Sequence, residues 1–367
     1  MHDEEKDTVG TPQGWARALI LGLTRDELRE VCLALEMPAF RAQQLWRWLY
    51  VQRVADWAQM TNIGRAERER LAARFSLDPA VSVAVEGAAS ETRKVLLELQ
   101  DGERVEEVLI PAPGRDTVCL STQVGCRFAC VFCASGQAGF RRNLVAGEIL
   151  GELLAATRAL GGLPSNIVYM GIGEPLDNYD AVLKSIRIMN DSEGLAIGAR
   201  RITISTSGII PGIERLAGEG LQVELSVSLH APDDALRSQL MPVNRMYPIA
   251  ELMAACARYF ESTNRIITFE YTLIRGVNDT RDHAERLARL LQAVRSRVNL
   301  IPLSTVEGFR GEPSLPATAE MFMAVLGKAG VNSTLRASKG SRIKAACGQL
   351  RLRTLATEHK APLHADE

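Results

Sequence analysis

Apolar residues recur at two different periods along this chain, and the change of period divides it. Between Trp15 and about Leu77 they return every three or four positions, which predicts a run of helices. Thr24 and Glu27 fit a capping box at the start of one of these helices. The tryptophans of this region are expected to be core residues rather than platforms for stacking bases: Trp46, Trp48 and Trp57.

From Pro79 the apolar residues alternate with polar ones, which is typical of strands. Two strand-like runs, KVLLELQ and ERVEEVLI, flank Asp101-Gly102. This dipeptide predicts a hairpin with a type I′ turn, in which both central residues have positive φ. The segment Pro111–Gly114 then predicts a linker.

Beyond Asp116, apolar runs alternate with helical segments. The expected strands are 118–123, 166–172, 201–206, 223–229, 266–274 and 298–303. The expected helices are 145–160, 178–190, 211–218, 248–262 and 279–294, followed by a last helix at 317–329 and a strand at 331–337. Near-continuous apolar strands with crossover helices indicate a parallel sheet. We therefore expect an α/β fold, a partial (β/α)6 barrel with its chemistry at the carboxyl ends of the strands.

These patterns predict five segments: a disordered tail at 1–14, a helical module at 15–78, a β-hairpin and linker at 79–115, a catalytic domain at 116–357 and a second tail at 358–367. No run of about 18 apolar residues predicts a membrane span. The start of the chain lacks the basic and apolar segments of a signal peptide, so we expect a cytoplasmic protein.

Charge is distributed unevenly, although the net charge is only −1. Thr117–Gly147 and Met321–Thr357 contain no Asp or Glu but several basic residues, among them Arg127, Arg141 and Arg142. Such segments are either solvated surface or sites for a polyanionic ligand, and the presence of cysteines in both favours the ligand.

Cys126, Cys130 and Cys133 form a Cys-x3-Cys-x2-Cys motif just after the first expected parallel strand. Three thiolates cannot complete a structural zinc site, which takes four ligands. An iron–sulfur cluster held by three cysteines would leave one iron open to a ligand. The alternative is a zinc site that recruits a fourth ligand such as His230.

Further candidates follow the expected strands. Gly173 and Glu174, within MGIGEP, could approach a ligand closely and accept a hydrogen bond from an ammonium group; alternatively they form an ordinary turn. Ser205, and Ser228-Leu229-His230, are either ligand contacts or strand caps. Cys347 lies in a basic segment that favours a nucleophilic thiolate, although it could be a buried structural cysteine. Cys32 and Cys256 are expected to be buried in the core.

The order of these motifs resembles the RlmN/Cfr family of radical S-adenosylmethionine (SAM) RNA methyltransferases. The resemblance covers about residues 17–353 and includes FRAQQLWRWLY, VLIP, CLSTQVGC, GFRRNL, MGIGEP, STSG, SLHAP and AACGQL. It implies a [4Fe–4S] cluster, one per chain, on Cys126, Cys130 and Cys133. It implies SAM contacts at Gly173, Glu174, Ser205, Ser228, Leu229 and His230.

The resemblance also implies a mechanism. Cys347 would be methylated by one SAM, and a radical from a second SAM would take a hydrogen atom from that methyl group. The carbon radical would add to C2 of an adenine in 23S rRNA, with tRNA as a second substrate. Glu106 would remove the ring proton, and Cys119 would release the product by forming a disulfide with Cys347.

The resemblance leaves alternatives open. One is a Cfr-like enzyme that methylates C8; others are a radical SAM enzyme acting on a protein or small molecule, and a zinc-stapled RNA-binding protein. Two positions depart from the family: Ser304 replaces an asparagine that contacts SAM, and Arg342 stands where an acid is common. The implied partners are RNA, an electron donor such as flavodoxin or ferredoxin, and a thiol reductant. The chain is expected to act as a monomer without a membrane.

Overall fold

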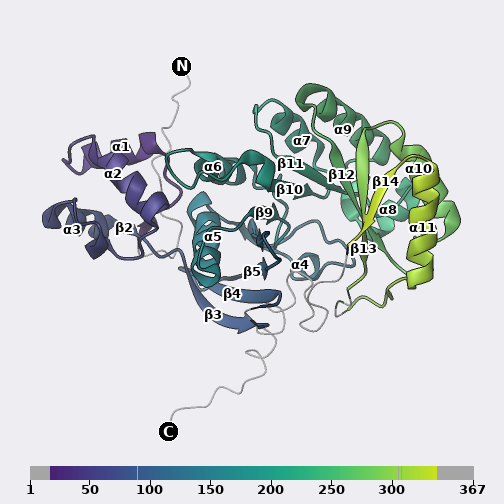
Figure 1. Cartoon of the computed structure of the whole chain (residues 1–367), viewed down its shortest axis with the longest axis horizontal. Helices are drawn as coiled ribbons and strands as arrows, with labels where there is room; N and C mark the ends of the chain where they lie inside the picture. Colours follow the sequence, from purple (N-terminus) through teal and green to yellow (C-terminus); the bar gives the residue numbers. More distant parts are fainter. Residues whose placement is uncertain (1–16, 89, 305, 307, 337–367) are drawn as a thin grey trace, which may run out of the picture.

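The computed structural model describes residues 17–336, apart from 89, 305 and 307. Cys347, Arg342 and both predicted tails lie outside the described residues. Figure 1 shows the N-terminal helices at one side of the molecule and α9 (Ile249–Thr263), α10 (Arg281–Leu291) and α11 (Pro316–Lys328) at the other. Among the described helices, none is long and apolar enough to cross a membrane.

A small helical module comes first. Its elements are β1 (Ala18–Leu19), α1 (Arg25–Ala34), α2 (Arg41–Trp46), a π-helical segment (Arg47–Gln52), a short 3-10 turn (Trp57–Gln59), α3 (Arg65–Arg74) and β2 (Phe75–Ser76). The predicted capping box is confirmed, because Thr24 and Glu27 exchange backbone and side-chain hydrogen bonds. Trp46 is buried in the core, and Trp48 and Trp57 pack against it partly buried, as predicted.

Ion pairs fasten this module to the rest of the chain. Arg25 at the start of α1 pairs with Asp191 and Glu193, which follow α6 (Tyr179–Asn190). The contact joins residues more than 160 positions apart, so the module packs against the rest of the described chain.

The predicted hairpin is present, but its turn differs from the prediction. β3 (Ala80–Glu86), β4 (Arg93–Leu99) and β5 (Arg104–Ile110) are antiparallel. Only Gly102 in the β4–β5 turn has a positive φ, of 80°, and its N–H donates to the carbonyl of Leu99 at 3.0 Å. The loop is therefore of the three-residue type, in which only the last residue is in the left-handed region. Gly102 occupies that position.

The main sheet has ten strands in the order β14-β13-β12-β11-β10-β9-β6-β5-β4-β3. Its parallel part consists of β6 (Thr117–Cys119), β9 (Asn166–Tyr169), β10 (Ile202–Thr206), β11 (Glu224–Ser228), β12 (Ile267–Leu273), β13 (Ser296–Pro302) and β14 (Asn332–Leu335). The helices between these strands are α5 (Ala146–Leu160), α6, α7 (Ile210–Ala217), α8 (Asp234–Leu240), α9, α10 and α11. The predicted α/β fold is confirmed, and the hairpin continues its sheet through the antiparallel pairing of β5 with β6.

Three short elements around the cysteine motif, and α8, were absent from the prediction. β7 (Gln123–Gly125) pairs with β8 (Phe140–Asn143), and α4 (Ala134–Gln137) begins directly after Cys133. None of these elements is longer than about two periods of a helix or strand pattern, so periodicity gave little signal for them.

Strand register gives the sheet two distinct faces. Ser205 lies opposite Ser226, Ser228 opposite Glu270, and Glu270 opposite Asn299. Because side chains alternate along a strand, the intervening residues point to the other face. That face is apolar and covered by helices: Val118, Ile167, Ile204, Leu225, Val227 and Phe269. The polar side chains of these strands therefore gather on one face of the sheet.

Candidate active site

Most of the predicted site residues lie at one edge of the sheet. They share a position at the carboxyl end of a parallel strand: Cys119 on β6, Gly173 and Glu174 after β9, Ser205 on β10, Ser228, Leu229 and His230 at the end of β11, and Ser304 after β13. Parallel neighbouring strands point their carboxyl ends the same way, so residues far apart in the chain converge there.

The three-cysteine loop is fixed by backbone hydrogen bonds on both sides. The N–H of Cys126 donates to the carbonyl of Gly139 at 3.1 Å. The N–H of Val131 donates to the carbonyl of Leu240, the last residue of α8, also at 3.1 Å. The loop is therefore held in shape by the protein itself, which prepares its side chains to bind a ligand.

The three thiols lie close enough to influence one another. Burial raises the pKa of Cys130, and the nearby Cys133 and Cys126 raise it further. Burial, with Cys133 adding to it, raises the pKa of Cys126 to about 12. Binding of a cation strongly stabilises the thiolate form in such surroundings, because iron displaces the thiol protons and neutralises the thiolate charges. The donor set therefore fits an iron–sulfur cluster.

His230 is not placed to complete a zinc site with the three cysteines. Nδ1 of His230 accepts a hydrogen bond from the N–H of Thr272 at 2.9 Å, which assigns the proton of the neutral ring to Nε2. Burial lowers the pKa of His230 to about 3. Neither ring nitrogen then offers a free lone pair, so His230 is not a fourth zinc ligand in this structure.

The glycines after β9 permit a close approach of two backbone segments. A Cβ atom on Gly171 would lie 2.6 Å from the carbonyl oxygen of Leu120, and one on Gly173 would lie 2.7 Å from Oγ1 of Thr122. Gly173 also has a φ of 111°, which other residues rarely adopt. The MGIGEP segment is thus packed directly against the strand that leads to the cysteine loop.

The buried side chain of Glu174 connects the ends of two strands through hydrogen bonds. Its Oε2 accepts a hydrogen bond from the N–H of Ser207 at 2.6 Å, and its Oε1 accepts one from the N–H of Leu176 at 3.0 Å. Burial raises the pKa of Glu174, whereas these backbone donors favour the carboxylate. The structure therefore shows a positioning contact that the sequence did not predict.

Arg237 on α8 is a buried residue that the sequence analysis missed. Its Nη2 donates to the carbonyls of Ser207 at 2.6 Å and Ser228 at 3.0 Å, and its Nε donates to that of Leu229 at 3.2 Å. Burial lowers the pKa of Arg237 to about 10. The guanidinium holds together the segments that follow β10 and β11. Arg237 could have been identified from the sequence only if α8 had been predicted first.

Ser304 is exposed and lies beyond the end of β13. The same strand carries an asparagine deeper in the sheet, because Asn299 donates to Oε1 of Glu270 at 3.1 Å. Glu270 is buried on the polar face and was also missed by the sequence analysis. An acidic residue in the middle of an apolar strand was the feature of the sequence that could have identified Glu270 as a candidate.

Glu106 and Cys119 share the polar face of neighbouring strands. Val108 lies opposite Cys119, and Glu106 lies two residues along β5 from Val108. Glu106 is 1% exposed, and its Oε2 lies 3.3 Å from Nζ of Lys94, which is 0% exposed. The third predicted member of this group, Cys347, lies outside the described residues, so the structure brings together two of the three.

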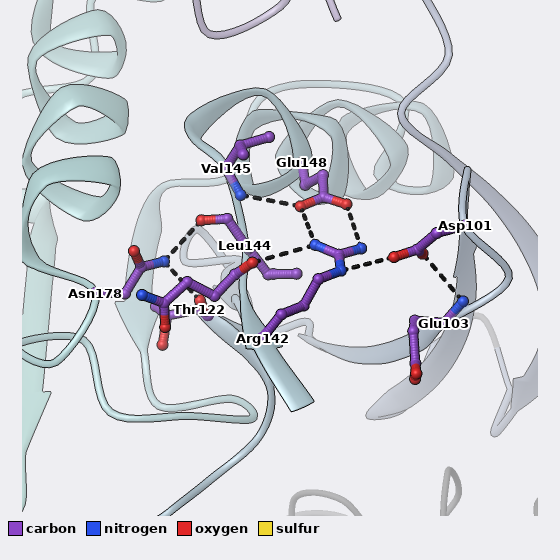
Figure 2. Close-up of polar contacts among 9 residues, drawn as sticks. Asp101, Glu103, Thr122, Arg142, Leu144, Val145, Glu148 and Asn178 are labelled. Carbon is purple, nitrogen blue, oxygen red and sulfur yellow. Dashed lines mark hydrogen bonds and ion pairs between the residues drawn. The ribbon is translucent and has the colours of Figure 1, made fainter. Parts of the chain in front are cut away.

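Arg142, from the acid-free segment around the cysteines, is a partly buried side chain paired with acids. Figure 2 shows its guanidinium between Glu148 and Asp101, with Nη1 and Nη2 donating to Glu148 at 2.8 and 2.9 Å and Nε to Asp101 at 2.7 Å. These contacts supply acids that the segment itself lacks, so the acid-free segment is not free of acidic partners at Arg142. The contact ties the hairpin turn to the N-terminus of α5.

Comparison with known sequence families gives two matches. The Radical SAM superfamily matches residues 120–291, and a domain described as the ribosomal RNA large subunit methyltransferase N-terminal domain matches residues 19–77. The two matches correspond to the parallel sheet with its cysteine loop and to the helical module.

Curated relatives match over nearly the whole chain. Proteins named "Probable dual-specificity RNA methyltransferase RlmN" from Geobacillus thermodenitrificans and Moorella thermoacetica are 47% and 49% identical. Each alignment covers 90% of this chain, with 92% and 96% of the relative. A solved radical SAM methyltransferase from Sphaerobacter thermophilus is 46% identical, with a TM-score of 0.87 over 90% of this chain and 98% of that one.

Proposed function

The chain belongs to the RlmN family of radical SAM methyltransferases, and from this membership we propose that it methylates C2 of an adenine in 23S rRNA and in tRNA. The observation that carries the proposal is an identity of 47–49% over 90% of the chain, including both the helical module and the cysteine loop. The dual specificity in the names of these relatives supports two RNA substrates.

We assign the cofactors to residues at the carboxyl edge of the sheet. Cys126, Cys130 and Cys133 would hold one [4Fe–4S] cluster, which with SAM supplies the radical that abstracts hydrogen. SAM would lie along the strand ends at Gly173, Glu174, Ser205, Ser228, Leu229 and His230, with Ser304 at the rim. Glu174 and Arg237 support this arrangement, because they hold the strand ends in place before any ligand binds.

We propose three catalytic residues around the substrate adenine. Cys347 would carry the methyl group and form a covalent bond to the ring carbon. Glu106 would accept the ring proton, and Cys119 would attack the sulfur of Cys347 to release the product and form a disulfide. The shared face of Glu106 and Cys119 supports this division of work, since both side chains project from the same side of two neighbouring strands.

The remaining parts of the proposal concern organisation and partners. We propose that residues 15–78 form an accessory domain that binds RNA and that residues 79–115 connect it to the catalytic domain at 116–357. We also propose that each turnover uses two SAM molecules. A flavodoxin or ferredoxin would supply electrons, and a thiol reductant would reopen the disulfide. The enzyme would act as a monomer in the cytoplasm, where its RNA substrates are.

The test is nucleoside mass spectrometry of rRNA and tRNA after incubation with the anaerobically reconstituted enzyme, SAM and a reductant. We expect 2-methyladenosine in both RNAs. Detection of 8-methyladenosine instead would replace C2 by C8, and absence of any methyladenosine would overturn the proposal. Cys133→Ser is the control, because losing one cluster ligand should abolish all products.

A further inference from the structure

Arg237 carries a positive charge into the interior without contacting a carboxylate. Its side chain is 0% exposed, and all five N–H groups of the guanidinium donate to uncharged oxygens. The acceptors are four backbone carbonyls and one side-chain amide: those of Ser207, Ser228, Leu229 and Tyr247, and that of Asn244. A buried charge is costly unless an opposite charge lies nearby, so the position of Arg237 calls for an anion.

Two acids near Arg237 do not contact it. Asp234 lies one turn earlier on α8 and is exposed, and its Oδ1 accepts hydrogen bonds from Asn244 and from the N–H of Ile249. Water screens such a carboxylate, so it offsets little of a buried charge. Glu174 is separated from Arg237 by Ser207, whose N–H donates to Glu174 and whose carbonyl accepts from Arg237. These acids therefore give the guanidinium no direct ion pair.

The three-cysteine loop packs against the segments that Arg237 holds. Val131 and Phe132 lie between the second and third cysteines of the motif. The N–H of Val131 donates to the carbonyl at the last residue of α8, the helix that carries Arg237. The ring of Phe132 meets the ring of His230 edge-on, with 4.8 Å between centroids. The loop is thus in contact with both α8 and the residues that follow β11.

The charge of Arg237 reaches the cysteine motif. Burial lowers the pKa of Arg237, and Cys130 is the group that counters this effect most. Burial also raises the pKa of Cys130; Glu174 raises it further, whereas Arg237 lowers it. His230, which touches the loop, adds no charge at neutral pH, because burial lowers its pKa to about 3. Arg237 is therefore a buried positive charge within electrostatic range of a proposed iron ligand.

We propose that Arg237 is a buried counter-charge of the proposed iron–sulfur cluster and raises its reduction potential. The proposal rests on the proposed function, in which Cys126, Cys130 and Cys133 hold that cluster. Three thiolates around the doubly positive core of the oxidised cluster give a net negative charge, and reduction makes this charge more negative. A fixed positive charge nearby stabilises the reduced form more than the oxidised form.

The step that Arg237 favours is the transfer of one electron. The electron leaves the flavodoxin or ferredoxin, which is oxidised, and enters the cluster, which is reduced; no bond forms or breaks at Arg237. The guanidinium is already charged before the electron arrives, so no proton has to be taken up to balance it. Because five hydrogen bonds hold the guanidinium in place, the protein does not have to rearrange either.

The test is a potentiometric titration of the anaerobically reconstituted enzyme at pH 7 without SAM, followed by electron paramagnetic resonance of the reduced cluster. Arg237→Gln removes the charge. A unit charge at about 10 Å changes an equilibrium constant about tenfold at an effective dielectric constant of about 20. We therefore expect reduction of Arg237→Gln to be about tenfold less favourable, a potential more negative by about 59 mV for one electron.

Arg237→Lys separates charge from hydrogen bonding, because it keeps the charge and loses the planar fork of donors. Its potential should stay close to that of the wild-type enzyme. The control is Arg245→Gln, which removes an exposed arginine from the segment Pro242–Arg245 after α8 and should leave the potential unchanged. Iron analysis confirms that each variant carries the cluster.

Equal negative shifts in Arg237→Gln and Arg237→Lys, or an unchanged potential in Arg237→Gln, would overturn the proposal. If Arg237→Gln does not retain the cluster, Arg237→Lys decides alone: a wild-type potential supports the role of the charge, and a tenfold loss contradicts it. If the wild-type enzyme itself bound no cluster, the proposed function would have failed instead. The two failures are therefore distinguishable.

Discussion

The carboxylate of Glu174 accepts a hydrogen bond from the backbone N–H of Ser207 at 2.6 Å, which joins the ends of β9 and β10. Both residues are buried, and they are 33 positions apart. The contact fixes the spacing of two strand ends that would otherwise depend on loops alone. It makes Glu174 a support of the proposed SAM site, whatever it contributes to the cofactor directly.

Glu174→Gln should therefore weaken both folding and SAM binding. The amide nitrogen of Gln cannot accept a hydrogen bond, so one buried N–H, of Ser207 or Leu176, would lose its partner at a cost of about 1–3 kcal/mol. Urea unfolding and calorimetric titration with SAM measure the two effects. Glu320→Gln, at an exposed position on α11, is the control. Unchanged stability in Glu174→Gln would contradict the assigned role.

Arg237→Lys should also destabilise the strand ends, although it keeps the charge. A lysine has no planar fork of donors and cannot reach the carbonyls of Ser207, Ser228 and Leu229 together. We expect a loss of about 3 kcal/mol in the free energy of unfolding, because buried carbonyls would lose their donors. Arg258→Lys, in an exposed pair with Glu214, should change stability by well under 1 kcal/mol by comparison. Equal effects in the two variants would show that the hydrogen bonds of Arg237 do not stabilise these strand ends.

The two cysteines proposed to act on the methyl group should fail at different steps. Cys347→Ala should still cleave SAM slowly but transfer no methyl group, because it lacks the sulfur that carries it. Cys119→Ala should form the bond to RNA and accumulate the protein–RNA adduct, because the attacking thiolate is missing. Denaturing gels and nucleoside mass spectrometry distinguish the two. Methylated RNA from Cys347→Ala, or clean turnover by Cys119→Ala, would refute the corresponding role.

Glu107 should make folding sensitive to pH. Burial raises its pKa to about 8, despite Arg158 and Arg93, and its carboxylate oxygens have no hydrogen-bond partner among the residues that the structure describes. Between pH 4.5 and 8 the unfolded chain ionises this group while the folded chain keeps it protonated. Its contribution to stability is therefore complete below about pH 4.5 and is lost as pH rises to about 8.

This contribution can be measured by urea unfolding at pH 6 and pH 8. The wild-type protein should lose about 2 kcal/mol from Glu107 over this range. Glu107→Gln should remove that part of the pH dependence, whereas Glu91→Gln, at an exposed position, should leave it intact. A pH dependence that persists unchanged in Glu107→Gln would show that another group causes it.

The parallel strands could be predicted because each is encoded locally. Ile267–Leu273 and Asn166–Tyr169, for example, fall within the expected strands 266–274 and 166–172. A run of β-branched and aromatic residues between helical segments is enough to indicate a covered strand. The turn at Asp101-Gly102 was predicted in place but not in type, because the φ of Asp101 depends on strand register rather than on the dipeptide.

Some residues of the candidate site could also be predicted from the sequence, and others could not. The cysteine motif and the glycines before Glu174 are recognisable because their chemistry is contained within a few neighbouring residues. The pairing of Arg142 with Asp101 and Glu148 could not be predicted, because both acids lie outside its acid-free segment. Arg237 was missed because nothing next to it in the chain shows that it would be buried among backbone carbonyls.

The sequence by itself thus determined the α/β fold, the three-thiol loop and the residues that end each strand, since hydrophobic period and motif spacing are properties of adjacent residues. Only the tertiary structure decided which charges are neutralised and which are kept. Lys94 and Glu106 are two ordinary charged residues in adjacent strands until the sheet buries both beside Cys119. Burial and pairing depend on segments that meet only on folding, so the contact between Lys94 and Glu106 became visible only in the structure.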